Sequence, residues 1–157
     1  MNLSLLIGTV GALAGVGLGS WLSARAQRGL FIENRREAMR QTQLDACITF
    51  LEAYRKLTRF VLDDADEVTL VRHPAVEGRT YPQIEDEGPL FEERDAAEAR
   101  LRALVSGESP VRLAAGALAA AYFDMARARA QFGRDHVPSQ ILRDLRAVED
   151  HFFSSSL

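Results

Sequence analysis

The chain begins with a long segment that carries no charged side chain, Met1 to Ala24, and Arg25 and Arg28 follow it directly. As an α-helix rising about 1.5 Å per residue, this segment would measure roughly 35 Å, enough to cross a bilayer hydrocarbon core of about 30 Å. The sequence therefore predicts an N-terminal transmembrane helix. We assign residues 1–28 to a membrane anchor with juxtamembrane arginines.

The charges that flank this segment predict its orientation, because an excess of Arg and Lys stays on the cytoplasmic side of a membrane. All the nearby basic side chains follow the segment: Arg25, Arg28, Arg35, Arg36 and Arg40. We expect a single-pass protein of the cell membrane with its N-terminus outside and its C-terminal domain in the cytoplasm. Trp21, Arg25 and Arg28 are predicted to contact lipid head groups, and membrane lipid is thus one expected partner.

A secretory signal peptide is the alternative interpretation of the N-terminus. Ala24-Arg25-Ala26 has the small-x-small pattern of a cleavage site, and cleavage there would release a secreted helical protein. The segment lacks the basic n-region of a signal peptide, which favours the anchor.

Small residues recur at every fourth position inside the predicted anchor, at Gly11, Gly15, Gly19 and Ser23. On a helix they form one smooth stripe, where a second helix could approach closely within the membrane. This pattern predicts self-association or a partner helix. Glycine is also common in anchors whose helices do not pair, and that alternative stays open.

The remaining residues, 29–157, have the length and composition of one folded domain, with 47% hydrophobic and 26% charged residues in the whole chain. Between Leu30 and Leu62 there is no proline, and the residues of the predicted apolar face recur at spacings of three and four: Leu44, Cys47, Ile48, Leu51, Tyr54, Thr58, Val61 and Leu62. This period predicts one long helix. Asp63 and Asp64 are unfavourable at a helix C-terminus, so the helix should end near them.

The composition and the periodicity of the sequence change after this helix, and we predict a long loop at about residues 66–89. This stretch contains three prolines and two glycines without a helical period. Val68, Leu70, Val71 and Tyr81 could form a short pair of strands, but a loop that moves or binds a partner is the favoured interpretation.

Three further helices are predicted from their start and stop residues. The first begins at Pro89 and stops at Gly107, the second begins at Ser109-Pro110 and ends at Gly133, and the third opens at Pro138-Ser139. Their predicted buried residues include Leu101, Leu118, Tyr122, Phe132, Leu145, Phe152 and Phe153. The predicted fold is all-α: a transmembrane helix followed by a small bundle of about four helices.

The stretch from Leu113 to Ala121 is rich in alanine and has little side-chain bulk. Tight packing against a neighbouring helix is the favoured interpretation. An exposed groove for a partner is the alternative, because a smooth alanine face can serve either use.

The charge distribution argues against a nucleic-acid partner. Residues 1–62 carry eight basic and four acidic side chains (+4), whereas residues 63–157 carry eleven basic and eighteen acidic ones (−7). An acidic body repels phosphate, and the basic stretch lies beside the predicted anchor, where anionic lipids attract it.

We find no sequence pattern for catalysis, for a cofactor or for a metal site. Cys47, the only cysteine, lies on the apolar side of the first long helix and is expected to act as a small hydrophobe. His73, His136 and His151 lack metal-ligand spacing. We therefore predict no catalytic, cofactor-binding or metal-binding residues, no small-molecule substrate and no enzyme, although an enzyme with an unrecognised site remains a second alternative.

Four short stretches together resemble uncharacterised small membrane proteins of actinobacteria: residues 19–28 (GSWLSARAQR), 35–38 (RREA), 50–54 (FLEAY) and 109–115 (SPVRLAA). The resemblance implies a glycine-rich anchor and a cytoplasmic helical body, and it implies no activity. With the observations above, it leads us to expect a non-catalytic scaffold or regulatory protein that binds itself or a protein partner at the membrane.

Overall fold

The computed structural model describes residues 3–72, 80–84 and 88–157, and within these ranges it describes side chains from Trp21 onward. The contacts divide the chain into two units, residues 1–41 and residues 42–157. Helix α1 (Leu3–Arg59) belongs to both units by sequence.

The first unit is helical from Leu3 onward, and every residue from Trp21 to Gln41 is exposed. The side chains of residues 1–20, on which most of the predicted anchor depends, lie outside the described part. Within the described residues, we find no helix with a stretch long and apolar enough to span a membrane.

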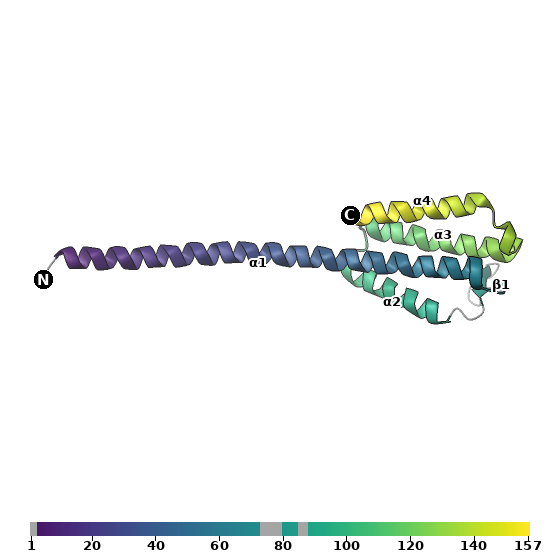
Figure 1. The fold of residues 1–157 in the computed structure, drawn as a ribbon, viewed down its shortest axis with the longest axis horizontal. Helices are drawn as coiled ribbons and strands as arrows, with labels where there is room; N and C mark the ends of the chain where they lie inside the picture. Colours follow the sequence, from purple (N-terminus) through teal and green to yellow (C-terminus); the bar gives the residue numbers. More distant parts are fainter. Residues whose placement is uncertain (1–2, 73–79, 85–87) are drawn as a thin grey trace. The chain divides into compact units, whose positions relative to one another are not determined.

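The second unit is a helical bundle with one small sheet (Figure 1). The C-terminal part of α1 leads into a π-helical turn, η1 (Phe60–Asp64), and then into strands β1 (Val68–Arg72) and β2 (Thr80–Ile84). The second unit continues with helices α2 (Gly88–Leu104) and α3 (Pro110–Phe132). It ends with the 3-10 turn η2 (Arg134–His136) and helix α4 (Ser139–Ser156). The predicted helical bundle is confirmed.

Aromatic rings join three of these helices in the core. The ring centroid of Phe50 on α1 lies 4.8 Å from that of Tyr54 and 5.3 Å from that of Phe152 on α4. Tyr54 in turn meets Tyr122 of α3 edge to face, at 5.6 Å. All four side chains are almost completely buried, and aromatic pairs at these distances stabilise a core beyond the area that they bury.

Local chemistry explains the helix ends that the sequence predicted. The N–H of Ala65 donates to the carbonyl of Phe60 at 2.7 Å, which closes η1 beside the acidic residues Asp63 and Asp64. At the start of α3, the Ser109 hydroxyl accepts from the backbone N–H of Arg112 at 3.3 Å. Gly133 ends α3 with φ at +82°, a conformation that favours glycine.

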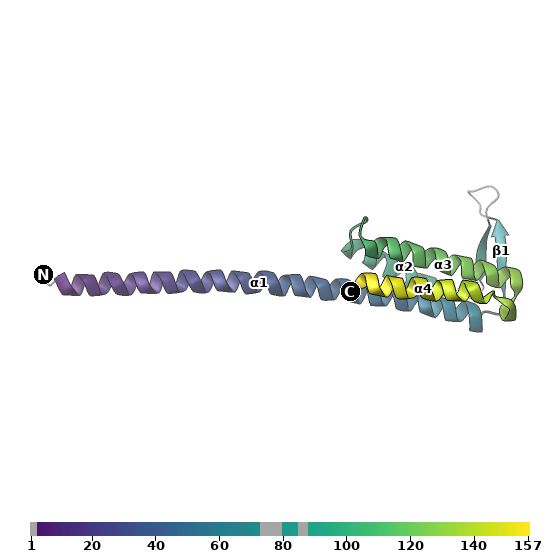
Figure 2. The same cartoon turned by 90° about the horizontal axis from the view of Figure 1, so that it is seen from above.

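The predicted loop at residues 66–89 is wrong where the structure describes it, and the fold is therefore not purely α. β1 and β2 form an antiparallel pair in which Val68 faces Ile84 and Val71 faces Tyr81. Val68, Pro82 and Ile84 are buried, and the strands pack beside α3 (Figure 2). Burial of this face stabilises a pair that would be marginal alone. Residues 73–79 and 85–87 of the predicted loop lie outside the described part.

Two predicted core residues are also wrong. Phe132 is 51% exposed because it is the last residue of α3, although it lies on the same side of that helix as Met125, and Phe153 is 47% exposed because it lies to one side of the buried face of α4. The core gains Ala46, Ala53 and Leu57 of α1, which the predicted set of apolar residues did not include.

Candidate functional site

An apolar strip on the surface of α3 is the first part of the candidate site. Its members are spaced three or four residues apart and thus share one side of the helix: Leu113, Gly116, Ala117, Ala120 and Phe123. Leu113 is 69% exposed and Phe123 is 37% exposed, and the other three are exposed as well. We call these five residues the α3 face.

The alanine-rich stretch is buried on one side and exposed on the other. Ala114, Ala115 and Leu118 are buried in the bundle, which confirms tight packing on that side. Ala117 and Ala120 face solvent beside Leu113, which leaves a smooth apolar surface uncovered. An exposed strip of this kind marks a surface that a partner can cover.

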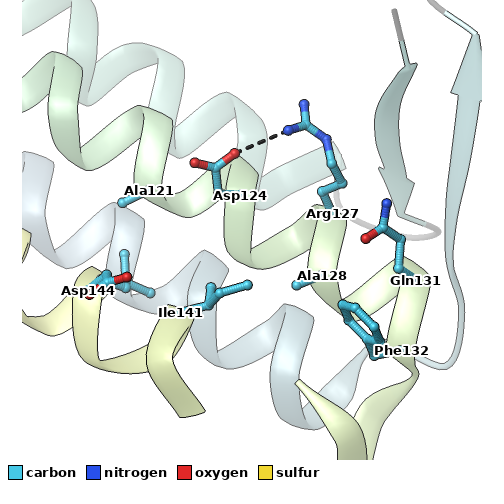
Figure 3. A pocket seen from close by; sticks show the side chains of 9 residues that line it. Ala121, Asp124, Arg127, Ala128, Gln131, Phe132, Ile141 and Asp144 are labelled. Atoms are coloured by element: carbon cyan, nitrogen blue, oxygen red, sulfur yellow. Dashed lines mark hydrogen bonds and ion pairs between the residues drawn. The ribbon is translucent and has the colours of Figure 1, made fainter. Parts of the chain in front are cut away.

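A groove of about 340 Å³ between α3 and α4 is the second part of the candidate site (Figure 3). Ile141, Leu145 and the small residues Ala121 and Ala128 give it an apolar lining. Phe132, half exposed, stands at one end of it (Figure 3). The remaining lining residues are polar: Asp124, Arg127, Gln131 and Asp144.

The carboxylates at the groove have partners nearby. Arg127 pairs with Asp124 at 3.1 Å, as drawn in Figure 3. Asp144 accepts a hydrogen bond of 2.6 Å from the Gln140 amide, whose oxygen accepts one from Arg143 at 2.8 Å. These exposed pairs orient the polar side chains at the edge of the groove. They contribute little to the free energy of unfolding.

The groove and the α3 face adjoin each other along the chain. Ala121 and Asp124 line the groove and directly follow Ala120 and Phe123 of the α3 face. Together they give α3 a mostly apolar outer surface with polar groups at one border. An apolar centre with a polar rim is typical of protein interfaces.

The predicted lipid-contacting residues lie in the first unit. Trp21 is 57% exposed, and the guanidinium of Arg25 lies 5.5 Å from the centre of its ring. Arg28 and Ser23 are exposed. The surroundings of Gly11, Gly15 and Gly19 lie outside the described residues, so the predicted stripe stays a prediction.

Cys47 is buried, as its place on the apolar side of the helix predicted. Burial raises the pKa of its thiol above the ordinary value of 9.0, and a hydrogen bond with Ser156 offsets part of that rise. A thiol with this environment is a poor nucleophile, since the thiolate is the reactive form.

Buried polar groups lie apart from the groove. Arg129 is 7% exposed and its Nη2 donates to the carbonyl of Ala65 at 3.3 Å, which links the end of α3 to the residue after η1. Burial, and next the charge of Glu98, raise the pKa of Tyr54 to about 12. Each has a structural explanation in the core.

The histidines are not brought together where the structure shows them. His136 lies in η2 and His151 on α4, both exposed, while His73 lies outside the described residues. No group of three or more potential metal ligands occurs within the described ranges.

Sequence reasoning named the alanine-rich stretch but missed the groove. The signal that could have found it is the seven-residue spacing of Ala121 and Ala128, which leaves a hollow of two helical turns on one side of α3. Comparison with protein families, with curated proteins and with solved structures finds no match for this chain.

Proposed function

We propose that this protein is a membrane-anchored, non-catalytic scaffold or regulator whose helical bundle binds a protein partner through the α3 face. The observation that carries the proposal is the exposure of five apolar residues along one side of α3, next to an apolar groove. Leaving such a strip in water is unfavourable, and a partner helix or sheet would remove it from water.

Photo-crosslinking tests the docking surface. A photo-reactive amino acid replaces Ala117 on the α3 face or, as the control, Ala147, an exposed alanine on α4. In cells, we expect one discrete crosslinked product from position 117 and none from position 147. Leu113→Asp should remove that product, because it places a charge within the strip. Equal crosslinking from both positions would contradict the proposal.

The anchor supports the membrane part of the proposal through its lack of charge and the arginines that follow it. The proposed topology has the N-terminus outside and the bundle in the cytoplasm, as in the small actinobacterial membrane proteins that the sequence resembles. Carbonate extraction of membranes should leave the full chain in the pellet. A mature protein that begins near Gln27 and accumulates outside the cell would instead support the secreted alternative.

Self-association through Gly11, Gly15, Gly19 and Ser23 is the proposed role of the small-residue stripe. Gly15→Ile would block close helix approach, so the oligomer in membranes should become smaller. Leu6→Ile, which leaves the stripe intact, is the control. An unchanged oligomer in Gly15→Ile would exclude the stripe as the contact.

A further inference from the structure

The exposed part of α1 starts within the predicted anchor, at Trp21, and its exposed large apolar side chains lie on several sides of the helix: Trp21, Leu22, Leu30, Phe31, Ile32 and Met39. Three of them are aligned. Successive residues of an α-helix are rotated by about 100°, so Trp21, Ile32 and Met39 fall within roughly 20° of one another. Their side chains are 57%, 51% and 54% exposed. They form a narrow apolar strip along one side of the helix.

Arginines border this strip on both sides. By the same rotation, Arg28 and Arg35 lie within about 40° on one side, and Arg25 and Arg36 within about 60° on the other. The acidic residues of the segment, Glu33 and Glu37, point at least about 100° away from the members of the strip. We call the strip and its four arginines the basic–apolar face, with members Trp21, Arg25, Arg28, Ile32, Arg35, Arg36 and Met39.

The arginines of this face have no carboxylate to neutralise them in the part of the chain that the structure covers. All four are exposed, and none forms an ion pair within those residues. The recorded neighbour of Arg25 is the ring of Trp21. The face thus offers positive charge around exposed apolar groups.

We infer that the basic–apolar face lies on a membrane surface that contains anionic lipid. An apolar strip bordered by arginines is the pattern of a helix in the membrane interface, where the strip enters the acyl boundary and the arginines reach the phosphates. Charge complementarity selects anionic head groups. The inference deepens the proposed function and rests on it, because the uncharged residues 1–24 would hold this face at the bilayer.

Lipid fits this face better than an acidic protein does. The three apolar side chains are spread over 18 residues, about 27 Å of helix, rather than gathered into one patch. A lipid surface adapts to such a spread, whereas a protein hot spot is a compact cluster. An acidic protein partner is therefore treated as an outcome of the test.

The position of Met39 makes the inference measurable. It lies 15 residues after Ala24, so a helix continuing straight out of the bilayer would carry it about 22 Å into water. If the face lies along the surface, Met39 reaches the lipid. Gly29, where an added Cβ would meet nothing within 4 Å, is a position at which a helix can change direction.

The experiment uses full-length protein in vesicles and tryptophan fluorescence. Trp21 is the sole tryptophan, so Trp21→Phe provides a silent background. Met39→Trp then reports from the basic–apolar face and Glu37→Trp from the opposite side. The vesicles contain phosphatidylcholine with brominated acyl chains, with or without phosphatidylglycerol.

In vesicles with phosphatidylglycerol, we expect the bromines to quench the Met39→Trp reporter at least twice as strongly as the Glu37→Trp reporter. Raising the salt concentration should reduce this difference. Adding Arg35→Gln and Arg36→Gln should abolish it. Arg40→Gln with Arg59→Gln, which removes the same charge outside the face, should leave it unchanged.

Equal quenching of the two reporters, or quenching independent of phosphatidylglycerol, would overturn the inference. The first result would favour an acidic protein as the occupant, and the second would show that the face needs no anionic lipid. Quenching of Trp21 fluorescence in the unmodified chain distinguishes failure of this inference from failure of the proposed anchor. If Trp21 is quenched and the Met39→Trp reporter is not, the anchor stands and the inference fails. If Trp21 is not quenched and the protein does not float with vesicles, the proposed anchor itself fails.

Discussion

Among single residues, Arg129 combines charge with burial. Its Nη2 donates to the Ala65 carbonyl, but its Nε has no hydrogen-bond partner within the described residues. A buried polar group without a partner reduces stability, whereas the alkyl stem of arginine packs like an apolar side chain.

We therefore predict that Arg129→Met changes the free energy of unfolding by less than about 1 kcal/mol, because methionine keeps the stem and removes the charge. Arg129→Ala should cost about 2 kcal/mol or more, since it also leaves a cavity. Urea unfolding of the two variants measures both values. Equal destabilisation by both variants would show that the guanidinium itself holds the end of α3.

Tyr54 gives the fold a dependence on alkaline pH. Burial and Glu98, and then Asp95, raise its pKa from 10.0 to about 12, while Arg94 and Arg102 oppose the rise. Because the folded-state pKa is the higher one, this contribution to stability is complete below pH 10 and decreases as the pH rises towards about 12.

We predict that Tyr54→Phe makes the free energy of unfolding less sensitive to pH between 10 and 12. Chemical unfolding at a series of pH values measures this slope. Tyr81→Phe, which leaves Tyr54 in place, is the matched control and should keep the original slope. The same slope in Tyr54→Phe and in the unmodified chain would contradict the assignment.

The burial of single residues could be predicted from the sequence for large apolar side chains but not for alanines. Apolar spacing identified Cys47, Leu51, Tyr54 and Val61 as buried, because large side chains at helical spacing leave few other arrangements. Ala46 and Ala53 were missed, because alanine is compatible with both core and surface. Phe132 and Phe153 were assigned to the core from their spacing, but Phe132 is the last residue of α3 and Phe153 lies beside the buried face of α4, so both stay about half exposed.

At the scale of helices and strands, one glycine within α3 and one directly after it illustrate opposite effects of one substitution. Gly133 ends the helix with φ at +82°, whereas Gly116 lies within the helix and an added Cβ there would meet nothing within 4 Å. Gly133→Ala should decrease the free energy of unfolding by about 1–2 kcal/mol, since alanine strains the left-handed conformation.

Gly116→Ala should instead increase the free energy of unfolding by up to about 1 kcal/mol, because alanine favours the helix. Thermal unfolding monitored by circular dichroism measures both variants. Destabilisation by Gly116→Ala would show that the α3 face is already covered by another part of the protein.

Helix ends could be predicted directly, whereas the strand pair was only the less favoured alternative to a loop. Ser109, Pro110 and Gly133 act through neighbouring backbone groups, so their effect is visible in the local sequence. The pairing of Val68 with Ile84 depends on residues sixteen positions apart and on burial against α3, which no local pattern records.

For the molecule as a whole, the buried core begins at Ala46 and thus lies within the second unit. We predict that residues 42–157 fold without the first unit and unfold cooperatively, with a free energy within about 1 kcal/mol of the full chain. Circular dichroism during urea unfolding of both chains tests this. A fragment without a cooperative transition would show that the first unit contributes to folding.

The candidate site was only partly predictable because it depends on assembly. The sequence showed that Leu113 to Ala121 has little bulk, but only the packing of α4 decides which of its sides stays exposed. The groove requires Ile141 and Leu145 to meet Ala121 and Ala128, which are close only in the folded bundle. The basic–apolar face, in contrast, follows from helical spacing alone once the helix is established.

The many alanines of the core have a consequence for how this protein can evolve. Within the described residues, eight buried positions are alanine: Ala46, Ala53, Ala65, Ala97, Ala114, Ala115, Ala126 and Ala128. At such sites a mutation can only enlarge the side chain or replace it with glycine. Both changes are unfavourable in a close-packed core, and seven of these eight sites lie within helices. Natural variants should therefore accumulate on the solvent side of the bundle, while alanine is retained at these eight positions.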